Sequence, residues 1–543
     1  MKNWKKLLFV ALAGVPASVV PASNNCNDCE SACNSGCCIE TTPSVSCGGG
    51  RITNKAVYVD VGYGQSGTYL HENFFRNELM DKREDGWGGA FQAVIFGGRT
   101  TDKGSKGLGR RFGFHHQRCF TAAAGPDADF FPTTPNPVEP NIDGRDIDAI
   151  NFNVNTTNGN YNSIICLCPR QSVIGALLSW KQSLCADDEG KTRWWFEVNA
   201  PIVHSRHTMG LSETPGTEDF GTAVDAIGLS GKPFVATIAE GFAQMDYARI
   251  DNCTHDNTEL ANIEFKLGYN SLADSDCFKF GSYVGFAAPT TEKRTAVFAF
   301  EPIVGQEHWA IMWGSTFDMK MCEWENSCLS THFAIDSRWW FQRNEKRTFD
   351  LLNKSWGRYQ GMYANLAQAQ EAIDTDNDNI GTFGSTILTR CVDVTPGYQI
   401  DFNTGLMWKG CKFMVEVGHT FYARQAEEVC PNWYGADSLP AIKGLTQGET
   451  NPTRTIGRQF PAEDFAIDFY NSNVIRACDV DWNAGAHEGI LAHSLYGSLG
   501  YEFDCGCYPT FLALGGSYDF GIEDKGTSIM DRWNLFGKLG VSF

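Results

Sequence analysis

Beyond its first 22 residues, the 543-residue sequence has no uninterrupted apolar run of the roughly 18 residues that a membrane-spanning helix needs. It also lacks the HExxH, GxSxG and Walker motifs of common enzyme classes. Positive charge is in deficit, with 44 Lys and Arg against 64 Asp and Glu and a net charge of −20. This charge argues against a nucleic-acid partner. We therefore expect a non-enzymatic chain with no cofactor and no helical membrane span.

Residues 1–22 have the pattern of a secretory signal peptide. Three lysines open the segment, an apolar run follows from Leu7, and small residues lead to Ala22. A membrane anchor is the alternative, but Pro16 and Pro21 interrupt a run that is already short for a spanning helix. Cleavage would remove the three lysines and change the net charge from −20 to −23.

Residues 23–50 form a cysteine-rich segment of the exported chain. Export to an oxidising compartment favours disulfides over a zinc or iron–sulfur site, although a CxxC followed by CxxxC leaves the metal alternative open. The sequence does not determine which cysteines pair. The disulfide candidates in this segment are Cys26, Cys29, Cys33, Cys37, Cys38 and Cys47.

Residues 51–543 repeat one theme, in which apolar and polar residues alternate along extended stretches separated by Gly, Asn, Asp and Pro. In the last stretch, Trp533–Phe543, one face is apolar and the other mostly polar, and the chain ends on Phe543. Such an ending is similar to the signal that outer-membrane barrels present to the barrel-assembly machinery. Other predicted strands are 57–63, 164–166, 173–180, 194–203, 260–270, 278–286, 309–321, 333–341, 413–421, 465–469, 491–503 and 512–520.

These patterns predict an all-β fold, a transmembrane antiparallel β-barrel. Several runs approach the ~9–11 residues of a tilted membrane strand, whereas strands of a soluble sandwich, the alternative, mostly have ~5–6. The length after Arg51 suits about 16 strands. Closure into a barrel would also remove the exposed edges of so long a sheet. We expect the short turn Cys168–Arg170 at the periplasmic end of this barrel.

The polar partners of the apolar faces are the candidate pore-lining residues, because a barrel that separates lipid from water turns its polar positions inward. They are Glu264, Lys266, Asp318, Lys320, Asp336, Arg338, Glu416 and Lys538. Outside this set, Ala364–Ala372 predicts a short loop helix or an element folded into the lumen.

No metal site is predicted. The acidic loop Asp374–Asp378 has the carboxylate spacing of a calcium loop, but Asn379 replaces the expected Gly and Ser385 the expected Glu, so a solvated loop is favoured. His204 and His207 could bind a metal ion but are more typical of lumen or loop positions.

Together, the signal peptide, the cysteines, the serial alternating strands and Phe543 resemble the porin-like major outer-membrane proteins of chlamydiae and related bacteria. The resemblance includes the stretches RWWFEVNAPIVHS (193–205) and FGSYVGFAAPT (280–290). It implies a barrel in the bacterial outer membrane, in contact with its lipid and linked by disulfides to envelope proteins. Homo-oligomers are common among porins, and the sequence leaves that point open.

The expected function is therefore that of an outer-membrane porin. Small hydrophilic solutes and ions would diffuse through a polar lumen with mild cation preference, and disulfides would stiffen the envelope. The alternatives are a structural or adhesive surface barrel without an open pore and a secreted soluble β-protein. The sequence does not determine the solute, pore size, oligomeric state or disulfide connectivity.

Overall fold

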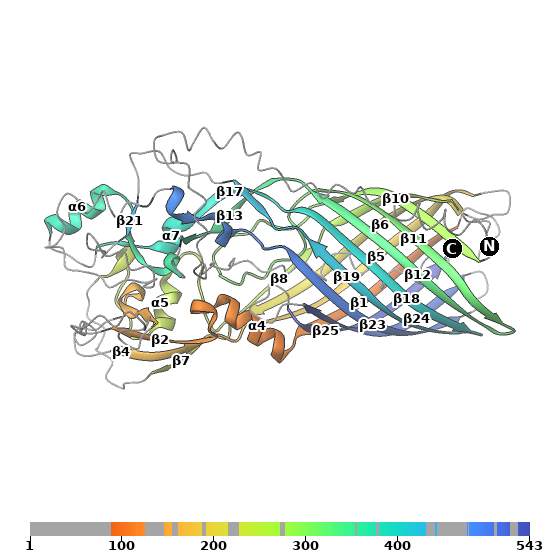
Figure 1. Ribbon diagram of the computed structural model, residues 1–543, viewed down its shortest axis with the longest axis horizontal. Helices are drawn as coiled ribbons and strands as arrows, with labels where there is room; N and C mark the ends of the chain where they lie inside the picture. The colour runs from red at the N-terminus through yellow and green to blue at the C-terminus, as the bar shows by residue number, and fades with distance from the viewer. Residues whose placement is uncertain are drawn as a thin grey trace, which may run out of the picture. The chain divides into compact units, whose positions relative to one another are not determined.

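The computed structural model contains a closed antiparallel barrel of twelve strands within the described part of the chain (Figure 1). The structure describes residues 88–124, 146–154, 161–186, 192–215, 227–271, 277–352, 356–375, 380–430, 440–442, 475, 477–503, 508–521 and 530–543. Around the ring the strands are β5 (Arg170–Ala186), β1 (Gly89–Thr100), β25 (Arg532–Ser542), β24 (Thr510–Gly521), β23 (Ile490–Phe503), β19 (Phe413–Arg424), β18 (Gly397–Gly410), β12 (Ser327–Trp340), β11 (Ala310–Trp324), β10 (Phe278–Ala288), β9 (Ile263–Asn270) and β6 (Thr192–Thr208).

Pairing between β5 and β6 closes the ring, and a further strand, β8 (Thr254–Leu260), extends the wall beyond β9. Both β8 and β9 pair with β6, with a break at Ala261 and Asn262 between them. The barrel prediction is thus confirmed, whereas the expected count of about sixteen strands is wrong. The difference arises because much of the chain length forms structure outside the ring.

The last residue of the chain completes the seam of the barrel. Phe543 exchanges two backbone hydrogen bonds with Gly89, at 2.8 and 2.9 Å, next to the paired strands β1 and β25. The face assignment of the last strand is confirmed: Trp533, Leu535 and Leu539 are exposed on the outside, while Lys538 is buried inside.

All short connections lie at one end of the barrel, which we call the turn end. They span residues 187–191, 271–277, 325–326, 411–412 and 504–509, and the long connections lie at the other end. In outer-membrane barrels, short turns are periplasmic and long loops extracellular. The turn Cys168–Arg170 precedes β5 at the long-connection end, so its expected periplasmic position is wrong. It joins β5 to β4, a strand outside the barrel ring.

The described residues of the long connections form a second set of elements, which we call the cap; they fall within residues 101–169, 209–253, 289–309, 341–396, 425–489 and 530–531. Its strands are β2 (Cys119–Ala124), β3 (Ile147–Asp148), β4 (Tyr161–Cys166), β7 (Ser212–Pro215), β13 (Arg343–Thr348), β14 (Asp350–Leu351), β15 (Gly361–Tyr363), β16 (Thr382–Phe383), β17 (Thr389–Thr395), β20 (Glu428–Cys430), β21 (Ala441–Ile442) and β22 (Val480–Asp481). Its α-helices are α4 (Asp102–Phe112), α5 (Ile238–Gln244), α6 (Leu366–Asp374) and α7 (Gly384–Leu388). Short 3₁₀ helices are η2 (Phe114–His116), η4 (Ala149–Phe152), η5 (Leu229–Gly231), η6 (Gly357–Tyr359), η9 (Ala477–Asp479) and η10 (Trp482–Gly485). None of the described helices is long and apolar enough to cross a membrane.

An aromatic core holds the cap together. Trp356 packs edge-on against Phe120 at a ring distance of 4.7 Å, and Phe242 packs similarly against Phe152 at 4.9 Å. Buried aromatic pairs of this kind contribute about 0.5–1.5 kcal/mol each beyond the area they bury. At Gly241 in α5, an added Cβ would lie 2.2 Å from the carbonyl oxygen of Phe152, so this helix can approach the core only with glycine there.

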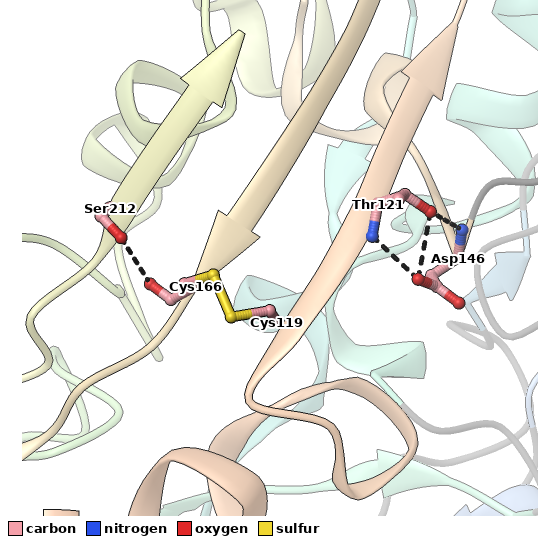
Figure 2. Close-up of a disulfide and its surroundings, with 5 residues drawn as sticks. All are labelled: Cys119, Thr121, Asp146, Cys166 and Ser212. Carbon is pink, nitrogen blue, oxygen red and sulfur yellow. Dashed lines mark hydrogen bonds between the residues drawn. A yellow bond between two sulfur atoms is a disulfide. The ribbon is translucent and has the colours of Figure 1, made fainter. Parts of the chain in front are cut away.

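The cap also contains the disulfide of the described residues. Cys119 of β2 and Cys166 of β4 are joined, and Ser212 of β7 donates a hydrogen bond to the Cys166 carbonyl oxygen (Figure 2). Nearby, Asp146 accepts hydrogen bonds from the backbone N–H and the hydroxyl of Thr121 (Figure 2). The six cysteines of residues 23–50, the predicted signal peptide and the predicted strands 57–63 and 465–469 lie outside the described residues.

The alternation of apolar and polar residues predicted most of the remaining barrel strands, but it did not predict β1 and β18. In β1 the inner face carries the apolar Ala90, Val94 and Phe96, so alternation of polarity is lost. In β18 the alternation is present, with exposed Leu406 and Trp408 on one face and buried Asp401 on the other, and period-two analysis could have located this strand.

The outer face of the barrel carries a belt of exposed apolar side chains, including Ile95, Val284, Leu495, Leu499, Leu514 and Leu535. Replacing Leu514 on β24 by Arg should lower the free energy of unfolding of the vesicle-folded barrel by about 2–4 kcal/mol, because the charge would face hydrocarbon. Urea titration of vesicle-folded protein measures this. The control is Leu352→Arg at an exposed cap position, which should cost little; equal losses would contradict a lipid-facing β24.

Candidate functional site

The inner face of the barrel is the candidate site. It carries many polar and charged side chains, whereas the outer face is apolar. Six predicted pore-lining residues lie on this face and are at most 5% exposed: Glu264, Lys266, Asp336, Arg338, Glu416 and Lys538. The other two, Asp318 and Lys320 of β11, occupy inward positions nearer the turn end and are half-buried. The Lys320 ammonium donates a hydrogen bond to the carboxylate of Glu323 at 3.2 Å.

The first group of inner charges joins the three strands β6, β9 and β12. Lys266 of β9 lies 3.4 Å from the carboxylate of Glu264 and 3.6 Å from that of Asp336, and Glu197 of β6 follows at 3.9 Å. Arg338 of β12 binds Glu264 at 2.9 Å and Asp336 at 3.0 Å. Removing one member of such a buried ion pair typically costs about 3–5 kcal/mol, because its partner keeps an uncompensated charge.

Sequence analysis missed several partners of these charges. Tyr283 of β10 donates a hydrogen bond to Asp336, and Asp401 of β18 interacts electrostatically with Arg338. Glu197 was also missed, although the alternation within Thr192–Thr208 places it on the inner face with Asn199. The signal that could have found Glu197 is thus the same periodicity that found Glu264.

A second polar group occupies the wall formed by β12, β18, β19 and β23. The hydroxyl of Tyr496 donates a hydrogen bond to Glu416 at 2.9 Å, and it lies 3.1 Å from His332 Nε2. His332 Nε2 also contacts Asn403 Oδ1 at 2.7 Å. Lys538 of β25 interacts electrostatically with both Glu416 and His332. The predicted residues Glu416 and Lys538 therefore belong to one group.

Apolar side chains fill other parts of the interior. Towards the turn end, Met407, Met414 and Phe511 form a buried cluster with Ala90 and Ala513. A second cluster combines inward-facing residues of β1, β5, β6 and β25 with Ala261 and Val304: Val94, Phe96, Val173, Leu177, Val203 and Phe536. Val304 is a loop residue, so this cluster shows that a cap connection enters the barrel.

The entering stretch is Pro302–His308, between β10 and β11, which we call the inward segment. All of its residues are buried. Its tip, Val304, packs in the barrel cluster, whereas the preceding Ile303 belongs to the aromatic core of the cap. Its base makes polar contacts with the barrel wall and the cap. The stretch Ala364–Ala372 lies largely in helix α6, which contacts β15 of the cap, so the alternative of a short loop helix is confirmed and the alternative of an element folded into the lumen is wrong. Nothing in the nonperiodic PIVG of the inward segment signals its position.

Arg294, Arg343 and Glu345 hold the base of the inward segment through Glu307 and His308. Glu307 accepts the backbone N–H of Arg294 at 3.0 Å and lies 3.2 Å from its guanidinium, while Arg343 donates to the Glu307 carbonyl oxygen. His308 bonds the Glu345 carboxylate through Nε2 and the Phe341 carbonyl through Nδ1 at 2.7 Å.

Glu345 continues this network into the cap. Arg347 binds Glu345 at 2.7 Å and Glu427 at 3.1 Å, and Arg424 at the end of β19 binds Glu427 at 2.7 Å. The inward segment is thereby connected to β13 and to the end of a barrel strand.

No group of three or more His, Cys, Asp or Glu within the described ranges is arranged to hold a metal ion. Of the histidines considered above, His207 faces the interior beside Gln171, whereas His204 points outward to Thr258. Of the acidic loop, only Asp374 and Thr375 are described, and Asp376 and Asp378 lie outside the described residues.

Cysteines gather at the turn end. Cys277, Cys322 and Cys411 are exposed in or beside three turns, and Cys185 and Cys328 lie on strands β5 and β12 close to two turns. This distribution was not predicted, because the positions of these residues relative to the turns require the strand register.

The sequence matches no protein-family model and no curated protein. An outer-membrane channel from Pseudomonas putida F1 is similar in structure at 8% identity and a TM-score of 0.37, over 84% of this chain and 96% of that chain. A FadL homologue from Pseudomonas aeruginosa is similar at 9% identity and a TM-score of 0.26, over 84% and 90%. The transport unit of the autotransporter AIDA-I from Escherichia coli has 6% identity and a TM-score of 0.30, over 88% and 98%. These values assign neither a family nor a solute.

The architecture itself defines the class of protein. A closed ring leaves no backbone edge, its outer face is apolar, and its inner face carries paired charges. The chain is a bacterial outer-membrane β-barrel, with the predicted location.

The base of the inward segment should respond to pH. Burial raises the pKa of Glu307 from 4.5 to about 7, against the opposing effect of Arg294. Burial also acts to raise the pKa of Glu345, but Arg347, the hydrogen bond from His308 and Arg294 lower it to about 2. The contribution of Glu307 to stability is therefore complete below pH 4.5 and lost as pH rises through 7, whereas that of Glu345 is lost as pH falls below 4.5.

We expect hydrogen exchange of the peptide covering residues 300–309, corrected for intrinsic rate, to increase when pH rises from about 6 to about 8. Glu307→Gln should abolish this increase. An increase of equal size in the Gln variant would show that another group is responsible.

Proposed function

We propose that this protein is an outer-membrane channel for small hydrophilic solutes and ions. The observation that carries the proposal is the inner face, on which acidic and basic side chains from at least five strands meet in a ring closed to lipid. A barrel that served only as an anchor could fill its interior with apolar side chains and avoid the cost of burying charge. Polar side chains along the interior can instead form hydrogen bonds and ionic contacts with a solute, which replace the solute's contacts with water.

The lumen would be narrow. Barrels of eight strands are just filled by side chains and those of 16–18 strands leave an aqueous channel, so a ring of twelve lies between these limits. Inward-facing residues such as Asn199, Asp336 and Asp401 are at most 1% exposed. We therefore propose passage of small solutes only, with mild cation preference from the acidic excess of the whole chain.

A structural or adhesive surface barrel is the second candidate, and the cap favours it. The cap has its own aromatic core and the Cys119–Cys166 disulfide. Its described residues are therefore packed against one another and do not form a set of independent loops. The tight packing of the interior also suits a barrel that does not conduct.

Conductance in a planar bilayer under a salt gradient distinguishes the two candidates. The channel proposal expects discrete current steps and a small reversal potential of the sign that marks cation preference. Lys266→Gln, which removes a buried inner cation, should strengthen that preference, and Lys103→Gln in the cap is the matched control. Stable insertion without current in the wild type and in variants would favour the structural candidate.

We further propose that cysteines at the turn end link the barrel to envelope proteins. Cys277, Cys322 and Cys411 are exposed there, and short turns of outer-membrane barrels face the oxidising periplasm. Electrophoresis of isolated envelopes should show high-mass species without reductant and a single monomer band with it. Replacing these three cysteines by serine should diminish those species. Serine replacement of the cap residues Cys253 and Cys391 is the control, and equal losses would contradict a turn-end link.

A further inference from the structure

We propose that the inward segment, Pro302–His308, is the constriction that sets the size limit of the channel, with Val304 at its narrowest point. The inference rests on the proposed channel function and assigns its size selection to specific residues. It starts from burial: Val304 is 0% exposed although it belongs to a loop between β10 and β11.

The neighbours of Val304 place it inside the ring. It shares a cluster with inward-facing side chains of β1, β5, β6 and β25, which are the strands on the far side of β9 from β10 and β11. A loop that connects β10 to β11 reaches these strands only by entering the barrel. The width left for a solute therefore depends on the side chain at its tip.

The turn behind this tip requires glycine. Gly305 has a φ of +66°, and an added Cβ would lie 2.9 Å from Asn262 Oδ1 and 3.1 Å from the Ala261 Cβ. Glycine adopts this positive φ without steric cost, and the chain bends here between the apolar tip and the polar base. The lack of room for a Cβ at Gly305 shows that this bend lies close to Ala261, at the break between β8 and β9.

Asn262 at that break fastens the base to the wall. Its Oδ1 accepts the backbone N–H of Gln306 at 2.6 Å, and its Nδ2 donates to the carbonyl oxygen of His308 at 3.2 Å. The Asn262 side chain thus bonds one backbone N–H and one backbone carbonyl of the segment, as the backbone of a neighbouring strand would. Glu307 and His308 add the contacts with Arg294 and Glu345 described above.

The base is consequently held by hydrogen bonds and ion pairs, while the tip is held by apolar packing. Substitution at the tip should change the free cross-section without releasing the base. A shorter side chain at residue 304 is expected to admit larger solutes, and a larger one is expected to exclude those that the wild type admits.

The test compares Val304→Ala, Val304→Phe and Lys293→Ala, the last at an exposed position of the same connection. Each purified full-length variant is checked for the heat-dependent electrophoretic shift of a folded barrel. Single-channel conductance and swelling of liposomes in sugars of increasing mass are then measured. We expect Val304→Ala to raise conductance at least about twofold and shift the swelling cutoff to larger sugars, Val304→Phe to lower both, and Lys293→Ala to match wild type.

If all four proteins conduct with equal steps and equal cutoffs, the constriction proposal is overturned while the channel function stands. If wild type is silent and Val304→Ala conducts, the segment is the closing element and the proposal holds. If every protein inserts and none conducts, including a variant with Ile303–Gly305 replaced by a Gly-Gly linker, the channel function fails and the constriction fails with it. Should Val304→Phe not fold, Val304→Ala and the linker variant decide.

Discussion

Closure of the strand ring is the constraint on which the rest of the structure depends. In hydrocarbon, an unpaired backbone group costs several kcal/mol, so the first and last strands must pair. Here β1 pairs with β25 from Ala90–Ser542 to Thr100–Arg532, and Phe543 adds the bonds to Gly89. The ring fixes which side of every strand points inward and thereby where each charged residue lies.

Once the ring is closed, its interior has to be filled or hydrated. Charges that face inward lose much of their water, and they remain ionised only beside opposite charges. This explains why Arg338 lies between Glu264 and Asp336 and why Lys266 has three carboxylate neighbours. The inward segment adds Val304 to the apolar side chains that β1, β5, β6 and β25 turn inward.

The cap influences the interior through this segment. Its base contacts Glu345 of β13, and the same network reaches Glu427 beyond β19. The position of the segment therefore depends on cap folding as well as on the wall.

The sequence by itself determined the barrel and the inner face, because period-two alternation is a local property: it predicted the faces of Trp533–Phe543 and the inward places of Glu264, Arg338 and Glu416. It could not determine the number of strands, since cap strands and barrel strands have similar local patterns. Nor could it find the inward segment, whose position depends on Asn262, Glu345 and the apolar wall, all remote in sequence. Only the tertiary structure decided these features, because they arise from contacts between residues that the chain brings together after the ring has closed.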